Sequence, residues 1–401
     1  DNGMTVVVEP MPWQRTAAFA LTLGGGVVAE PVDRSGLAGM VCEMVQRGAG
    51  SHSSRDLVAV QDNLGIDRNS GVSTTTTSFG GAMPADSLSA AIELYADILR
   101  RPHLPGDQLD DARAMMVQEL RALQDEPTHR VMRRLRQLHY GDRLGRSSHG
   151  DEAGLSAITS ADVRDFFTNT YHAGGAILGI AGNVDVPRIL DEVEAAFGDW
   201  KSGDVAVPPR PTGAAAQEHI DAPGAAQTHI GFAFKSVPYG HDDYFRMRAG
   251  IGILSDGMSS RLFDRVREQR GLCYTVSAGC HSLPHAGGVF GYAGTTPARA
   301  QETLDVTLRE IAGLADDLHD DELARWKVRI ESGLIMEQES SASRASSLAN
   351  DVYQLGRPIP TDQLERMIEQ ITLGDVRDYW AEHPPVEHRI VTFGPDPLIL
   401  N

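Results

Sequence analysis

The sequence predicts an α+β fold built from two tandem copies of one unit. At 401 residues the chain is too long for one ordinary hydrophobic core, which favours two or more domains. Residues 158–167, ITSADVRDFF, recur at residues 371–380 as ITLGDVRDYW, and a strand-like run ending in glycine follows each copy. The shift of 213 residues also aligns other helical segments of the two halves, which indicates an internal duplication. Residues 207–216, VPPRPTGAAA, have no periodicity and are typical of a linker.

These observations predict an N-terminal domain over residues 1–205, a linker over 206–218 and a C-terminal domain over 219–401. In the first half, residues 4–9, 16–23 and 176–182 have the composition of strands. Residues 71–79 are rich in threonine and poor in large hydrophobic residues, so we expect a strand at a sheet edge. Helices are predicted over residues 54–64, with Ser54 as the N-cap, and over 87–99, 106–139, 158–171 and 187–197.

Composition excludes several classes of protein. The formal net charge of −19 argues against binding nucleic acid, and no apolar run approaches the roughly 20 residues that span a bilayer. An acidic surface would suit a cavity for basic peptides, or it serves solubility alone. Three cysteines imply no disulfide framework. We expect a soluble protein without a membrane or nucleic-acid partner, with the cytoplasm favoured over the periplasm.

A further helix is predicted where apolar residues recur at helical spacing, at Leu37, Met40, Val41, Met44 and Val45. This stretch resembles the zinc-site helix G-L-A-H-x-x-E-H-M-x-x-x-G of the M16 (pitrilysin-type) metallopeptidases. The framework residues match, but the two His positions hold Gly39 and Glu43, and the Glu position holds Cys42. Catalytic zinc needs three protein ligands and a nearby base, and glycine offers no ligand atom. We therefore expect no zinc in this chain.

The resemblance implies two tandem α/β units, each a mostly antiparallel sheet with helices packed on it, that form half of a clamshell. It also implies that the family's third zinc ligand falls on Glu119, although a solvated glutamate on a long helix explains this residue equally well. A rebuilt metal site made of Cys42, Glu43 and Glu119 is a further alternative, but nothing in the sequence supplies a base beside it.

In the family, the strand at residues 71–79 takes the substrate peptide by β-augmentation. The resemblance therefore predicts peptide contacts at Ser73, Thr74, Thr75 and Thr76. The alternative is an ordinary edge strand that loops protect.

A second segment, residues 261–276, is similar to the family pattern S-R-L-F-x-x-[LV]-R-E-x-R-G-L-x-Y-x-V at nearly every position. In the family, its arginine and tyrosine hold the substrate backbone and help to stabilise the oxyanion at the zinc. The matching residues here are Arg267 and Tyr274. A guanidinium and a phenol suit this role, because both donate hydrogen bonds to an oxygen on which charge develops. From their spacing alone, these residues would be interpreted as a surface arginine and a tyrosine in a strand. The match along the whole segment instead favours the functional interpretation.

The resemblance implies the non-zinc subunit of a heterodimeric metallopeptidase, similar to the alpha-type subunits of the mitochondrial processing peptidase. Its partner would be an M16 subunit with an intact H-x-x-E-H motif and a bound zinc, and its substrate an extended peptide. The chain is not expected to cleave peptides alone. Two alternatives stay open: an inert structural relative, like the core subunits of respiratory complexes, and a stand-alone peptide-binding module.

Overall fold

The computed structural model describes residues 2–205 and 207–400, which divide into two compact units. The first unit takes the chain up to Ala122, together with Arg146–Pro209 and Ile335–Ile359. The second takes Leu123–Gly145, Arg210–Leu334 and the chain from Pro360 onward. The domain and linker boundaries proposed from the sequence stay a prediction, and three residues at those boundaries, Asp1, Ala206 and Asn401, lie outside the described residues.

The first unit is built on a five-stranded sheet in the order β1–β7–β2–β6–β5. The strands are β1 (Thr5–Pro10), β2 (Thr16–Gly24), β5 (Asp67–Val72), β6 (Thr76–Pro84) and β7 (Ile177–Gly182). Only β1 and β7 run parallel, and the other neighbours are antiparallel. A separate short ribbon joins β3 (Gly48–Ala49) and β4 (His52–Ser53). The predictions for β1, β2 and β7 are confirmed to within one residue at each end.

The second unit has a sheet of the same design, in the order β10–β11–β9–β12–β8. Its strands are β8 (Ala216–Asp221), β9 (Thr228–Ser236), β10 (Cys273–Leu283), β11 (Ala286–Thr295) and β12 (Arg389–Gly394). Here β8 and β12 are parallel and the other neighbours antiparallel. Strands matched in chain order occupy the same places in both sheets, so the predicted α+β fold with two repeated units is confirmed.

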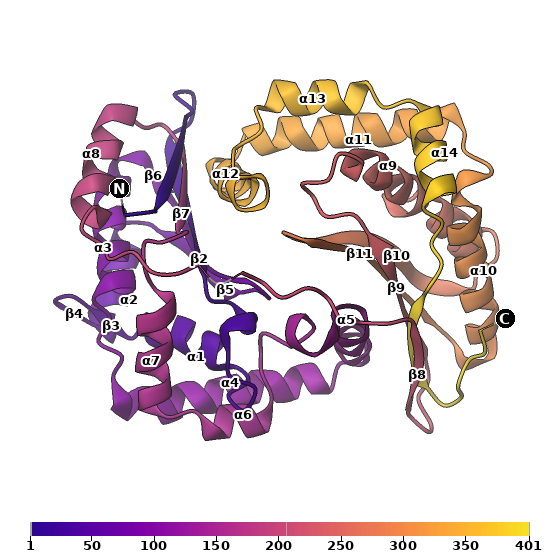
Figure 1. The fold of residues 1–401 in the computed structure, drawn as a ribbon, viewed down its shortest axis with the longest axis horizontal. Helices are drawn as coiled ribbons and strands as arrows, with labels where there is room; N and C mark the ends of the chain where they lie inside the picture. Colours follow the sequence, from indigo (N-terminus) through magenta and orange to yellow (C-terminus); the bar gives the residue numbers. More distant parts are fainter. Residues whose placement is uncertain (1, 206, 401) are drawn as a thin grey trace. The chain divides into compact units, whose positions relative to one another are not determined.

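Helices cover both faces of the first sheet. They are α1 (Leu37–Met44), α2 (Ser54–Asn63), α3 (Leu88–Arg100), α4 (Leu109–Gln124), α6 (Glu152–Ala157), α7 (Ser160–Thr170), α8 (Val186–Phe197) and α12 (Ser341–Leu355). The main core of the unit includes residues of α1, α3, α7 and α8 and of the sheet. The other face packs against α12, which Figure 1 draws in the colours of the end of the chain. Gly179 of β7 permits this approach, because a Cβ there would overlap the carbonyl oxygen of Ala345.

The second unit repeats this arrangement with a helix from the first half of the sequence. Its helices are α5 (Pro127–Leu144), α9 (Tyr244–Ser255), α10 (Ala300–Ala312), α11 (Asp320–Gln338, whose last turn counts with the first unit), α13 (Thr361–Glu369) and α14 (Leu373–Glu382). The core joins α9, α10, α11 and α14 to the sheet, and α5 packs on β9 and β12. Among the helices that the structure describes, none is both long and apolar enough to cross a membrane.

The repeated segment has a physical role in both copies, because each begins a helix with a capping box. The Thr159 hydroxyl accepts a hydrogen bond from the backbone N–H of Asp162 at 3.2 Å, and the Asp162 carboxylate accepts one from the backbone N–H of Thr159 at 2.8 Å. Thr372 and Asp375 form the same pair at the start of α14. Such caps satisfy backbone donors that a helix leaves unpaired at its first turn.

Two predictions about helices are wrong. The single helix predicted over residues 106–139 is two helices, α4 and α5, which meet at Asp125 and Glu126. Pro127 explains the break, because proline disrupts a helix interior but is favoured in the first turn. The N-cap of α2 is Ser53 rather than Ser54, and its hydroxyl accepts a hydrogen bond from the backbone N–H of Asp56 at 3.3 Å.

Candidate functional site

Helix α1 is fixed at its start by a buried carboxylate. Glu30 is only 3% exposed and accepts hydrogen bonds from the backbone N–H groups of Gly36, at 3.2 Å, and Ala38, at 2.9 Å. Burial raises the pKa of Glu30 to about 7, although the two backbone donors act in the opposite direction. Gly36 has φ of 96°, a left-handed conformation that glycine adopts without strain. The apolar stripe of the helix is buried, as predicted from its spacing.

The other face of α1 lines a cavity of about 390 Å³. Gly39, Cys42 and Glu43 lie on its wall together with Glu119 of α4, so the structure brings all four predicted zinc-motif positions to one place. Residues 70–72 of β5 and the side chains of Met115 and Met116 complete much of the remaining wall.

One residue of this cavity was missed from the sequence. His149 lies in the loop between α5 and α6, and its Nδ1 is 3.5 Å from Oε1 of Glu119. No motif or periodicity marks this histidine, and only the path of the chain after α5 brings it to the cavity.

The residues of this cavity do not fit a catalytic zinc ion. Gly39 has no side chain, and burial raises the pKa of the Cys42 thiol to about 12, whereas the metal ligand is the thiolate. Glu43 is paired with Arg47, whose Nε lies 3.0 Å from its carboxylate. Within residues 2–205 and 207–400, no three His, Cys, Asp or Glu side chains are grouped so that they could hold a metal ion.

The prediction of one edge strand over residues 71–79 is wrong. Ser73, Thr74 and Thr75 form the turn between β5 and β6, and Thr76 begins β6, which lies inside the sheet between β2 and β5. The Ser73 hydroxyl accepts hydrogen bonds from the backbone N–H groups of Thr75, at 3.2 Å, and Thr76, at 3.0 Å. A serine whose side chain accepts hydrogen bonds from the backbone of the residues that follow favours a turn over a strand. The many threonines of this segment are typical of strands and therefore hide this signal.

β5 is one of the two edge strands of this sheet, and its residues 70–72 line the cavity. Among the described strands, β5 pairs with β6 on one side and with none on the other. Gln46, in the turn after α1, ties α1 to β5, because its side-chain amide donates to the Ser70 hydroxyl at 3.1 Å and to the Cys42 carbonyl at 2.8 Å. An edge strand presents unpaired backbone groups that an extended peptide can pair with.

In the second unit, Arg267 lies near the end of a π-helix, Phe263–Glu268. The wide turn is marked by the backbone N–H of Gln269, which donates to the carbonyl of Asp264 five residues earlier at 2.8 Å. The Arg267 guanidinium lies over the Phe263 ring, 4.5 Å from its centroid, and the side chain is 41% exposed. π-helical turns are rare and occur frequently at functional sites.

Tyr274 occupies a β-bulge at the start of β10, an edge strand of the second sheet. Cys273 pairs with Thr295 and Thr275 with Gly294, so Tyr274 has no residue opposite it. The residue is 77% exposed, which leaves its hydroxyl accessible. Bulges of this kind redirect a side chain, and they recur next to active sites. Both members of the predicted pair are thus accessible and carried by irregular backbone.

Comparison with known proteins identifies the family. A family model described as insulinase (peptidase family M16) matches residues 5–152, and one described as the peptidase M16 inactive domain matches residues 157–328. The chain is 24% identical to an uncharacterised zinc protease of Rickettsia felis, over 94% of this chain and 91% of that protein. It is 26% identical to an uncharacterised zinc protease of Mycobacterium tuberculosis, over 94% and 87%.

A crystal structure described as the peptidase M16 inactive domain from Pseudomonas fluorescens has the same fold, with a TM-score of 0.89. The alignment has 21% identity and covers 100% of this chain and 97% of that one. The resemblance seen in the sequence is therefore confirmed, and the chain belongs to the M16 peptidase family.

Proposed function

We propose that this protein is the non-zinc subunit of a heterodimeric M16 zinc metallopeptidase. The observation that carries the proposal is a contrast between two sites in one chain. The zinc-motif cavity holds Gly39, a neutral buried thiol at Cys42 and an ion-paired Glu43. Arg267 and Tyr274, in contrast, are exposed on irregular backbone. A chain that is only a scaffold has no use for the second pair.

In this proposal, the substrate is an extended peptide that adds to the free edge of β5. Main-chain hydrogen bonds provide affinity in such an arrangement, and side chains provide specificity. The cavity beside β5 has room for a substrate side chain of moderate size. The peptide would lie along β5 itself, and the turn of Ser73, Thr74 and Thr75 would flank one end of it.

Arg267 and Tyr274 would act on the peptide bond undergoing cleavage at the zinc site of the partner subunit. The Tyr274 hydroxyl donates a hydrogen bond to the carbonyl oxygen as negative charge develops on it. The guanidinium of Arg267 stays charged at any relevant pH and holds the substrate backbone. The chain itself supplies no metal and no base.

The free edge of β5 also supports a second candidate, a stand-alone peptide-binding module. This candidate predicts peptide binding by the isolated chain and no dependence on a partner. If the chain is an inert structural relative, we expect neither peptide binding by the chain nor peptide cleavage by its complex with a partner.

Reconstitution tests these candidates. The chain would be assayed alone and with an M16 partner that has an intact H-x-x-E-H motif, using an unstructured fluorogenic peptide. We expect cleavage only by the complex, which gel filtration verifies, and a partner variant lacking the motif's glutamate is the control. Cleavage by the chain alone, free of contaminating protease, would overturn the proposal. Peptide binding without complex formation would establish the module instead.

A further inference from the structure

The second unit contains its own cavity, of about 170 Å³, between α9 and α11. It is the counterpart of the zinc-motif cavity. That cavity lies between α1 and the long helix α4, and this one lies between α9 and the long helix α11. Both α1 and α9 are the α-helix that follows the second strand of the unit. Shifted by 213 residues, α4 falls on residues 322–337 within α11, and Met116 falls on Arg329. The duplication has kept the place of the cavity and changed its chemistry.

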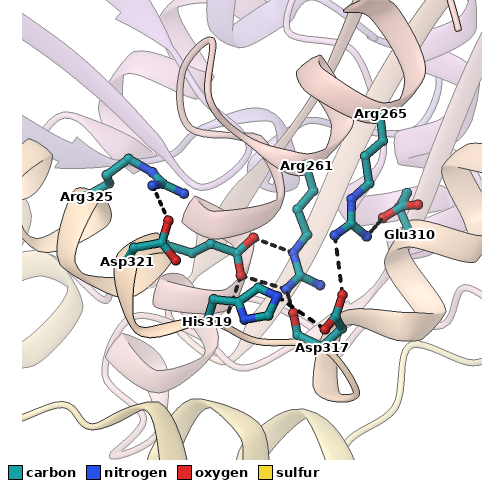
Figure 2. A network of polar contacts seen from close by, with 8 residues as sticks. Arg261, Arg265, Glu310, Asp317, His319, Asp321 and Arg325 are labelled. Atoms are coloured by element: carbon teal, nitrogen blue, oxygen red, sulfur yellow. Dashed lines mark hydrogen bonds and ion pairs between the residues drawn. The ribbon is translucent and has the colours of Figure 1, made fainter. Parts of the chain in front are cut away.

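The acidic residues of this second cavity are already neutralised. Glu322 accepts hydrogen bonds from Nε and Nη2 of Arg261, both at 2.7 Å, and from the backbone N–H of His319 at 3.0 Å. Arg261 is only 3% exposed and also donates to the carbonyl oxygen of Asp317, as Figure 2 shows. Asp256 is paired with Arg248 at 2.7 Å. Neither carboxylate is therefore left to repel an anion.

The arginines of the cavity wall are not neutralised in the same way. Arg325 contacts Asp321 at the surface, where an ion pair contributes little (Figure 2). Arg329, one helical turn later, has no ion-pair or hydrogen-bond partner in the part of the chain that the structure describes. Its Nη1 lies 3.1 Å from the position that a Cβ on Gly257 would take, which puts the guanidinium against the loop after α9. The uncompensated charge of this cavity is positive, in a chain of net charge −19.

We propose that this cavity binds a small oxyanion, a phosphate or a carboxylate, between Arg325 and Arg329. A guanidinium presents two parallel donors that match the oxygens of either group. The exposed Ser259 lines the same cavity and adds a hydroxyl donor. The volume admits one small anionic group and not a folded partner. This site is independent of peptide cleavage, because it uses none of the residues proposed for that reaction.

Titration calorimetry of the full chain at low ionic strength tests the site, with sodium phosphate and sodium succinate as separate probes. We expect saturable binding of at least one probe. Arg325→Ala and Arg329→Ala should each weaken it on the order of tenfold or more, because each removes a charge-assisted hydrogen bond. Arg329→Lys keeps the positive charge but loses the two parallel donors of the guanidinium, so it should weaken binding to an intermediate extent.

The matched control is Arg366→Ala, which removes an exposed arginine of the second unit that is also paired one turn earlier, with Asp362. It should leave binding unchanged. Saturable binding of phosphate alone or of succinate alone assigns the oxyanion. No saturable binding of either probe would overturn the proposal, as would equal weakening by the control, which would show diffuse attraction to surface charge.

Discussion

In the first unit, α1 presents Gly39 to a cavity, whereas in the second unit α9 packs Gly250 and Gly252 against tryptophan rings. A Cβ on Gly39 would come within 3.0 Å of the terminal methyl of Met116, a flexible group. A Cβ on Gly250 would overlap the indole of Trp380, and one on Gly252 the indole of Trp326. Both rings are almost fully buried.

This difference explains how one copy of a duplicated unit could change its chemistry without losing its fold. The face of α1 that carries Gly39, Cys42 and Glu43 borders a cavity, so substitutions on this face cost little packing energy. The corresponding glycines of α9 lie against buried tryptophan rings, although Gly252 also borders the second cavity, so larger residues there are constrained by shape. Arg267 and Tyr274, the pair proposed to act on the substrate, lie instead on exposed and irregular backbone.

The largest expected effect concerns Tyr274. In the reconstituted complex, Tyr274→Phe removes one hydroxyl from an exposed ring and should lower kcat by on the order of 10² to 10³, the usual cost of losing one oxyanion donor. KM should change little, because the ring is retained. The measurement is kcat and KM on the same peptide, with assembly checked by gel filtration. A near-normal kcat would show that the pair takes no part in catalysis. The chain would then be better explained as an inert structural relative.

Arg267→Ala should raise KM as well as lower kcat, because it removes a charged contact to the substrate backbone. Arg270→Ala is the matched control. Arg270 is a neighbouring arginine with a similarly exposed side chain, at 47%, and a loose contact of 3.6 Å to Glu302. If both variants change the kinetics equally, the effect is general electrostatics and not a contact of Arg267.

The next effect tests packing directly. Gly252→Ala should destabilise the protein by about 3 kcal/mol, because the new Cβ would overlap the rigid and almost fully buried indole of Trp326. Gly39→Ala should lie within about 1 kcal/mol of the wild type, because better helix propensity offsets the displacement of the Met116 methyl. Urea unfolding measures both. Equal losses for the two variants would contradict the contrast between an open and a packed helix face.

Much of this architecture could be predicted from the sequence, and the failures have local causes. Apolar spacing located α1, and the repeated segments that form the two capping boxes were enough to reveal the duplication. The turn at Ser73 was hidden because threonine-rich segments suit strands and turns alike. His149 and the pairing of Glu43 with Arg47 depend on how the chain folds around α1, and neither has a local pattern of its own.

The two units should also respond to pH in opposite directions. Glu30 has a folded pKa of about 7 against an ordinary 4.5, so the folded state keeps a proton that the unfolded chain releases between these values. Rising pH across that range should therefore cost on the order of 2 kcal/mol of stability. In the second unit, burial lowers the pKa of His139 and His281 to about 4, so stability falls as pH drops from 6.5 towards 4.

Unfolding free energies from pH 4 to pH 8 test this opposition. Glu30→Gln should reduce the loss of stability as the pH rises above 4.5. It should leave unchanged the loss of stability as the pH falls from 6.5 towards 4, which we call the acid limb. His281→Gln should reduce the acid limb, and the Tyr140 hydroxyl, which is 2.7 Å from Nδ1 of His281, can donate to the amide oxygen instead. A Glu30→Gln variant with the wild-type slope between pH 4.5 and 7 would show that Glu30 is not the titrating group.

The smallest expected effect is the response of the wild-type chain to zinc. With no ligand atom at Gly39, a neutral thiol at Cys42 and Glu43 held by Arg47, equimolar zinc should leave the unfolding midpoint unchanged. Elemental analysis after dialysis against a mild chelator should find no stoichiometric zinc. The triple variant Gly39→His, Cys42→Glu and Glu43→His restores the family motif beside Glu119 and should bind zinc, because a Cβ at position 39 would meet only the flexible Met116 methyl at 3.0 Å and the Ser148 carbonyl oxygen at 3.3 Å. One tightly held zinc per wild-type chain would instead mean that Cys42, Glu43 and Glu119 form a rebuilt site, and Glu119→Gln should then abolish it.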